Sequence, residues 1–121
     1  MSLGAMQDWS MRISHVIDHA AREAPDREIV THWADGSETR TDWSGIHRDA
    51  KKMSQALLAL GLTKGDKVAS LAMNHSRHLV SWFGVAGMGG VLHTCNPRLF
   101  EDQLEYIVNH AEDKVMLYDA A

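Results

Sequence analysis

The sequence predicts an α/β fold, in which an N-terminal helix, a β-hairpin and a second helix precede a β-α-β-α-β unit with parallel strands. Two observations carry this prediction. Between residues 67 and 118, short apolar segments alternate with segments of helical periodicity, which is typical of parallel strands joined by right-handed crossovers. Upstream, two segments with an apolar stripe of helical spacing flank a pair of short strands and an Asp-Gly turn.

The first helix and the hairpin are expected within residues 13–41. Apolar side chains in residues 13–24 recur at the spacing i, i+3, i+4, i+7, which places them on one face of a helix, and Pro25 ends it. Residues 28–34 and 37–41 are predicted strands. Asp35-Gly36 joins them, because glycine readily takes the positive φ that a tight hairpin turn requires.

A longer helix is predicted over residues 43–60. Asp42 is a favourable N-cap, and Gly61 follows the last turn, where a left-handed residue commonly ends a helix. The expected apolar stripe consists of Ile46, Ala50, Met53, Leu57 and Leu60. Residues 13–66 therefore form the first structural part of the chain, after a leader over residues 1–12 whose first residues we expect to derive partly from an added tag.

Residues 67–121 are expected to hold the parallel unit. Their strands are predicted to be buried on both faces, because they are almost continuously apolar. The strand–helix rhythm breaks off after Tyr118, so we expect one incomplete domain in place of a closed one. The predicted strands are 67–73, 91–95 and 114–118, and the predicted helices are 76–88 and 101–111.

Composition excludes several classes of protein. The chain has 121 residues, with 12 Lys+Arg against 16 Asp+Glu and a net charge of −4, which gives no support for nucleic-acid binding. Cys95 is the one cysteine, so no intrachain disulfide forms, which fits a reducing, cytoplasmic location. No apolar run approaches the roughly 20 residues of a transmembrane segment, and the N-terminus lacks the pattern of a signal peptide.

The glycines and histidines do not form a recognised ligand site. Glycines in residues 84–90 end a helix and lead into a strand, whereas a phosphate-binding loop needs the opposite order, so close helix packing is the better interpretation. His15 with His19, and His75 with His78, share helical faces but match no complete metal-ligand set. We expect these histidines to be structural.

Two further clusters are candidate functional sites. Cys95 and His93 lie two residues apart, so a strand would place them on one face, but a buried, inert cysteine is the better interpretation. Arg48, Lys51 and Lys52 are interrupted by Asp49 and indicate a solvated helix face. From these residues alone, the chain is an α/β domain without a complete active site.

Several segments resemble the start of acyl-CoA synthetases in the adenylate-forming superfamily, which includes fatty-acid–CoA ligases and luciferases. Residues 41–46 resemble the first core motif of that superfamily, and residues 83–97 resemble the second. Residues 56–61 and 64–69 are similar to the helix end, Gly-Asp turn and strand that lie between them. Residues 98–100 and 106–113 resemble the medium- and long-chain fatty-acyl-CoA ligase branch.

The resemblance covers roughly residues 13–119 and departs from the usual pattern at two positions. Asp42 stands where threonine is usual and still caps a helix. Gly45 stands where glutamate is usual, so the reciprocal contact of a capping box is lost. Glycine in the first turn also costs about 0.5–1 kcal/mol relative to alanine.

The resemblance implies an incomplete N-terminal subdomain of the acyl-CoA synthetase fold. The parent would convert a fatty or related carboxylic acid, ATP with Mg²⁺ and CoA to acyl-CoA through an acyl-adenylate. The family's phosphate loop, ribose-binding acid and C-terminal lysine are absent from this chain, so we assign it no catalytic, cofactor-binding or metal-binding residue. His93, Asn96 and Arg98 remain candidates for a minor place in a pocket wall, because ligands lie at the carboxyl ends of parallel strands.

Three hypotheses follow. The first is the N-terminal part of a fatty-acid–CoA ligase, inactive by itself. The second is a stand-alone, ligase-derived interaction module without catalysis. The third is an independent small nucleotide-binding protein, which the missing phosphate loop disfavours. Under the first two we expect the chain to self-associate or form a homo-oligomer, because an incompletely covered sheet exposes apolar surface.

Overall fold

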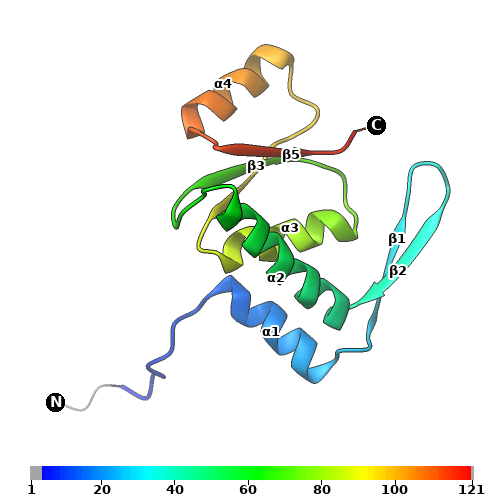
Figure 1. Ribbon diagram of the computed structural model, residues 1–121, viewed down its shortest axis with the longest axis vertical. Helices are drawn as coiled ribbons and strands as arrows, with labels where there is room; N and C mark the ends of the chain where they lie inside the picture. The colour runs from blue at the N-terminus through cyan, green and yellow to red at the C-terminus, as the bar shows by residue number, and fades with distance from the viewer. Residues whose placement is uncertain (1–3, 121) are drawn as a thin grey trace.

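The computed structural model describes residues 4–120 and confirms the predicted order of elements (Figure 1). Residues 1–3 of the expected leader, and residue 121, lie outside the described part. The helices are α1 (Ile13–Glu23), α2 (Trp43–Ala59), α3 (Ser76–Gly87) and α4 (Glu101–Ala111). The strands are β1 (Glu28–His32), β2 (Glu38–Asp42), β3 (Lys67–Leu71), β4 (Val91–Thr94) and β5 (Val115–Tyr118).

The β1–β2 hairpin projects from the body of the molecule (Figure 1). Its strands are antiparallel, with His32 opposite Glu38. Gly36 has a φ of +83°, and Asp35 Oδ1 accepts hydrogen bonds from the backbone N–H and hydroxyl of Ser37. Both strands are shorter at the turn than expected. The reason is that Trp33 N–H donates to the Ser37 carbonyl and Gly36 N–H to the Trp33 carbonyl, which closes a wider loop.

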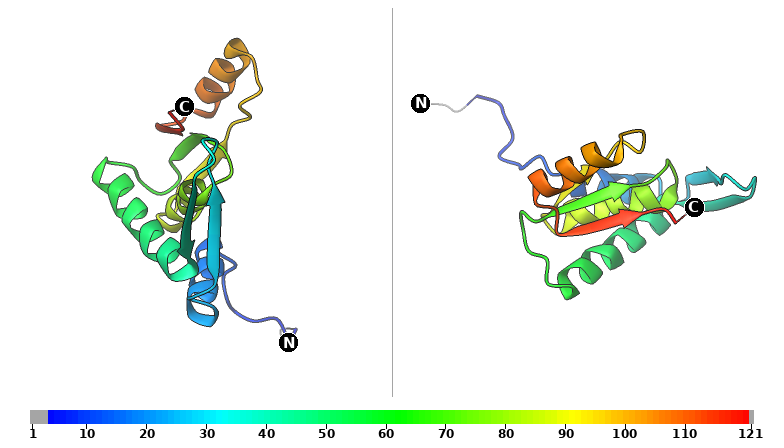
Figure 2. Two further views of the ribbon diagram at one scale, coloured as in Figure 1. Left: turned by 90° about the vertical axis from the view of Figure 1, so that its right-hand side faces the viewer. Right: turned by 90° about the horizontal axis from the view of Figure 1, so that it is seen from above.

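The second sheet has the strand order β4-β3-β5, with β3 parallel to both neighbours. Val68 lies opposite Leu92 on one side and Val115 on the other. Helices α2 and α3 lie on one face of this sheet and α4 on the other (Figures 1 and 2). Strand β3 therefore lies at the centre of a β-α-β-α-β unit, as predicted.

The core forms where α2 and α3 pack on the sheet. Leu57 of α2, Val68 of β3 and Val85 of α3 are almost fully buried and lie in one cluster with Leu62. Helices α2 and α3 make the most extensive contact between any two elements. The predicted stripe on α2 is confirmed at Ile46, Ala50 and Leu57, which are buried, whereas Leu60 is 69% exposed after the helix ends.

Burial on both faces is confirmed only for the central strand. Three consecutive residues of β3 are buried, whereas β5 alternates between half-buried and exposed positions. Met116 and Tyr118 point away from the core and remain exposed, at 37% and 68%. The prediction was wrong for β4 and β5 because both are edge strands, and because α4, with no buried residue, covers its face of the sheet only partly.

No helix among residues 4–120 is both long and apolar enough to cross a bilayer. Residues 4–12 run away from the body toward the N-terminus (Figure 1). Their one ring contact is between Trp9 and His15 of α1, whose centroids are 4.4 Å apart.

Candidate functional site

An open cleft of about 1060 Å³ lies at the carboxyl ends of β3 and β5, beside the first turn of α3 and the hairpin. In open parallel sheets, ligands bind at this edge, at the point where successive connections leave in opposite directions. The connection from β3 runs through α3 to β4, and α4 brings the chain back across the sheet to β5. Among the polar side chains that line it are those of Trp33, Ser70, His75, Arg77, His78 and Asp119.

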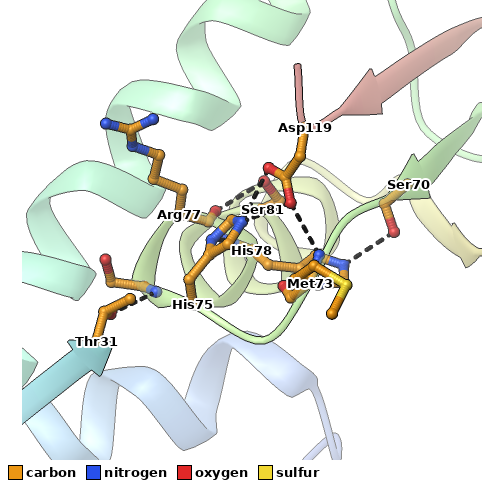
Figure 3. A network of polar contacts seen from close by, with 9 residues as sticks. Thr31, Ser70, Met73, His75, Arg77, His78, Ser81 and Asp119 are labelled. Atoms are coloured by element: carbon orange, nitrogen blue, oxygen red, sulfur yellow. Dashed lines mark hydrogen bonds and ion pairs between the residues drawn. The ribbon is translucent and has the colours of Figure 1, made fainter. Parts of the chain in front are cut away.

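Asp119 joins the end of β5 to the loop after β3 (Figure 3). Its Oδ2 accepts the backbone N–H of Met73 at 2.9 Å, and both carboxylate oxygens lie 2.9 Å from Nε2 of His75. The Met73 N–H bond, followed by the His75 contact, lowers the pKa of Asp119 below its usual value. This carboxylate therefore stays ionised in the folded protein at neutral pH.

Two histidines anchor the start of α3. His75 is the N-cap residue, and its Nδ1 accepts the backbone N–H of His78 at 3.1 Å. His78 in turn lies 3.0 Å from the buried Ser70 hydroxyl through Nε2 and 3.2 Å from the Met73 carbonyl through Nδ1 (Figure 3). All four ring nitrogens are thus engaged by protein atoms. These contacts fit the structural role expected from the sequence.

The hairpin forms the opposite wall of the cleft. The Trp33 ring lies 5.0 Å from the His75 ring, and the Arg77 guanidinium lies 5.0 Å from the centre of the Trp33 ring. Thr31 of β1 accepts the backbone N–H of Ser76 at 3.0 Å, which fixes the hairpin against α3. A segment 45 residues upstream therefore helps to shape this cleft.

The described residues contain no cluster of metal-ligating side chains. Within residues 4–120, no group of three or more histidine, cysteine, aspartate or glutamate side chains gathers closely enough to bind an ion. His15 stacks on Trp9, and His19 Nδ1 lies 3.4 Å from the Arg22 guanidinium.

Cys95 and His93 do not form a nucleophilic pair. The Cys95 thiol donates to the backbone carbonyl of His93, at 3.6 Å, and the His93 ring contacts Asp113 at 2.7 Å. Burial raises the pKa of the Cys95 thiol, and the nearby Asp113 carboxylate raises it further. A thiol with a raised pKa is a poor nucleophile at neutral pH, which agrees with the interpretation of an inert, buried cysteine.

The three candidates for a pocket wall lie away from the cleft. His93 contacts Asp113 at the end of α4, and Asn96 Oδ1 accepts the backbone N–H of Arg98 at 3.0 Å in the loop after β4. The cleft opens at β3 and β5, and none of the three lines it. The cleft lies at the carboxyl edge of the sheet named from the sequence, but beside β3 and β5, not beside β4.

Sequence reasoning also missed Trp33, Ser70 and Asp119 as parts of one site. Strand order β4-β3-β5 was the missing information, since it places the end of β5 next to the end of β3. An aspartate directly after a predicted strand was the available signal for Asp119. The glycines over residues 84–90 pack closely, as expected, with Gly84 against Met53 and Gly89 at a φ of +83°.

Comparison with known proteins decides the family. A sequence profile described as AMP-binding enzyme matches residues 17–121. The chain belongs to the AMP-binding enzyme family. The match includes every segment that carried the resemblance to acyl-CoA synthetases, from the N-terminus of α2 to residues 106–113 in and after α4.

The relatives of this chain include several CoA ligases. It is 48% identical over 118 residues to a 3-methylmercaptopropionyl-CoA ligase of Ruegeria lacuscaerulensis, covering 98% of this chain and 22% of the relative. It is 44% identical over 117 residues to a medium-chain-fatty-acid–CoA ligase of Ectopseudomonas oleovorans, covering 97% of this chain and 21% of that protein. The chain thus spans about a fifth of the length of the curated relatives it matches.

A solved structure supports the same fold. The crystal structure of the N-terminal domain of FACL13 from Mycobacterium tuberculosis matches with a TM-score of 0.83 and 25% identity, over 92% of this chain and 28% of that one. The elements described above are therefore those of an N-terminal domain in the AMP-binding family. At Gly45, where the family usually has glutamate, an added Cβ would lie too close to the Thr41 hydroxyl oxygen unless that side chain moved.

Proposed function

We propose that the protein containing this chain is an acid–thiol ligase, specifically a fatty-acid–CoA ligase. It would convert a fatty or related carboxylic acid, ATP and CoA to acyl-CoA through an acyl-adenylate. The observation that carries the proposal is the identity of this chain, along almost its whole length, to ligases named for a medium-chain fatty acid and for 3-methylmercaptopropionate. The protein would act in the cytoplasm, where ATP and CoA are available.

Within that enzyme, the described residues would serve as scaffold. Two charged side chains of the cleft contact other protein groups: Asp119 contacts His75 and the backbone N–H of Met73, and Arg77 lies over the Trp33 ring. Formation of an acyl-adenylate from ATP requires hydrogen-bond donors or cations placed to stabilise the charge that develops on the phosphates, together with Mg²⁺. Residues 4–120 hold no cluster of ligands for such an ion, so the 121-residue chain by itself should be inactive.

Acyl-CoA formation tests this proposal. The whole protein should form acyl-CoA from ATP, CoA and at least one acid in a series containing 3-methylmercaptopropionate, octanoate and palmitate. The 121-residue chain should form none with any of them. Product formation from the isolated chain would overturn the scaffold role, and its absence from the whole protein with every acid would overturn the ligase assignment.

The isolated chain should also self-associate. Strand β5 is an edge strand, and the exposed Met116 and Tyr118 side chains lie on it. Unpaired strand edges with apolar side chains are common sites of association. Light scattering over a range of concentrations should give a mass that rises above 13.5 kDa, and a constant monomer mass at high concentration would contradict the expectation.

The exposed edge of β5 also fits the alternative, a ligase-derived interaction module without catalysis. In that case, the whole protein would bind a partner through this surface and lack ligase activity. The acyl-CoA assay separates the two, because the module forms no product with any acid.

A further inference from the structure

The His75 ring makes two hydrogen bonds in opposite roles. It accepts at one ring nitrogen and donates at the other. Its Nδ1 accepts the backbone N–H of His78, and its Nε2 lies 2.9 Å from both carboxylate oxygens of Asp119. The His75 side chain is only 6% exposed. Both partners are thus held by one buried ring, which joins the N-terminus of α3 to the end of β5, 44 residues later (Figure 3).

These contacts fix the tautomer of His75. A nitrogen that accepts a hydrogen bond cannot carry a proton, so Nδ1 is unprotonated and Nε2 carries the hydrogen that is donated to Asp119. His78 has the opposite tautomer. Its Nδ1 faces the Met73 carbonyl at 3.2 Å and must donate, so its Nε2 accepts from the Ser70 hydroxyl. His75 and His78, three residues apart at the start of α3, are therefore held in opposite tautomers.

A second proton on His75 can bind only at Nδ1, and it would remove the cap of α3. The protonated ring has no acceptor left for the His78 N–H. The positive charge would also lie at the helix N-terminus, where the helix dipole disfavours cations. Three charged or titratable groups lie around the ring: Asp119 at the end of β5, and His78 and Arg77 on α3, with Arg77 across the Trp33 ring of the hairpin. Only Asp119 favours the added charge.

We propose that His75 is a proton-sensitive clamp between β5 and α3. As the neutral Nε2–H tautomer it holds both elements. When Nδ1 takes a proton from solvent, the ring keeps Asp119 but releases the His78 N–H, so the first turn of α3 loosens along the wall of the cleft. The clamp acts on the described cleft and does not depend on the proposed ligase activity.

The tautomers give the most direct test. Nitrogen NMR of the 121-residue chain at neutral pH should show an unprotonated Nδ1 in His75 and a protonated Nδ1 in His78. The opposite assignment for His75 would overturn the proposal, as would a mixture of its two tautomers. Because this measurement uses the unaltered chain, it remains decisive even where a variant fails to fold.

Hydrogen exchange tests the release of the cap. As the pH is lowered from about 8 to about 5, the range in which histidines ordinarily change charge, protection of the His78 amide, corrected for intrinsic exchange, should fall by roughly 2-fold to 30-fold, the range expected for a lost cap. Protection of the Val85 amide in the core of the same helix should be unchanged. Constant protection at His78 while His75 becomes protonated would contradict the clamp.

Variants of His75 distinguish the loss of the N-cap hydrogen bond from the effect of a positive charge on the ring. His75→Asn supplies a cap acceptor that does not titrate, so protection of residue 78 should persist as the pH falls. His75→Ala should show low protection at every pH. His110→Asn, which alters an exposed histidine stacked on Tyr106 of α4, is the matched control and should respond like the parent chain. A pH response that survives in His75→Asn would assign the effect to another group.

Discussion

Gly84 of α3 lies against Met53 of α2 so closely that a methyl group at Gly84 would be 2.6 Å from the Met53 Cγ. The Ala50 carbonyl oxygen would be 3.1 Å away. This contact sets the distance between the two helices that cover the core face of the sheet. Ser54 strengthens the same contact, because its hydroxyl donates to the Gly84 carbonyl at 2.5 Å.

Gly84→Ala should lower the free energy of unfolding by about 1–3 kcal/mol, because overpacking at a close helix contact forces the backbones apart. Urea unfolding measures this. Gly87→Ala is the matched control, since its added methyl group meets only the Ser54 hydroxyl oxygen at 3.1 Å and should cost less. A Gly84→Ala chain as stable as the parent would show that α2 and α3 are not held at this distance.

Asp42→Ala should destabilise α2. Asp42 Oδ1 accepts the Gly45 N–H at 2.7 Å, which caps the longest helix of the described chain. Loss of such a cap costs about 0.5–2 kcal/mol, whereas asparagine is an equally good cap. Thermal unfolding should therefore show a lower midpoint for Asp42→Ala and little change for Asp42→Asn. An equally lowered unfolding midpoint in the two variants would mean that the carboxylate charge matters more than the cap hydrogen bond.

Cys95 should react slowly with thiol reagents in the folded chain. Burial raises the pKa of its thiol, and only 6% of the residue is exposed. Alkylation by iodoacetamide at pH 8 should be more than about 10-fold slower in buffer than in unfolding concentrations of urea, because the thiolate is the reactive form. Similar rates in the two conditions would place the thiol at an accessible, activated site.

Asp119 should contribute to stability above about pH 4 and lose that contribution on further acidification. Its pKa is lowered in the folded chain, chiefly by the Met73 N–H and then by His75. A carboxylate with a depressed folded pKa stabilises the protein above its unfolded pKa of about 3.9 and loses this effect as the pH falls through the folded value.

The measurement is the midpoint of urea unfolding from pH 7 down to pH 2. Asp119→Asn should be less stable than the parent at pH 7, and the difference should shrink below about pH 4, where the parent carboxylate becomes protonated. Exposed carboxylates elsewhere remain in both chains, so they cancel in the comparison. If the difference in unfolding midpoint between the two chains stays constant with pH, the role of Asp119 depends on its shape and not on its charge.

Local pattern was enough to predict the order and type of every element. The helical spacing over residues 43–60 and the caps at Asp42 and Gly61 placed α2 to within one residue of its observed bounds. These signals are local, because a cap or an apolar stripe is decided by residues within a few positions. The Asp35-Gly36 turn is also local, and only the width of the loop around it differed.

Features that depend on contacts between distant residues could not be predicted. Thr31 bonds to the backbone of Ser76, and Asp119 to His75, over 45 and 44 residues. Neither pairing has a local signal, since each depends on strand order and on where the hairpin lies. For the same reason, the exposure of Met116 and Tyr118 was missed: an edge strand and a central strand have similar apolar sequences.

The most direct test of the central claim is carboxylate-dependent exchange of labelled pyrophosphate into ATP, the reverse of adenylation. The claim is that this chain is the scaffold part of a fatty-acid–CoA ligase. The whole protein should catalyse the exchange when a suitable acid is present and not when it is omitted, and the 121-residue chain should catalyse none. Exchange by the 121-residue chain would contradict the scaffold role, and a whole protein that is inactive with every acid would contradict the ligase.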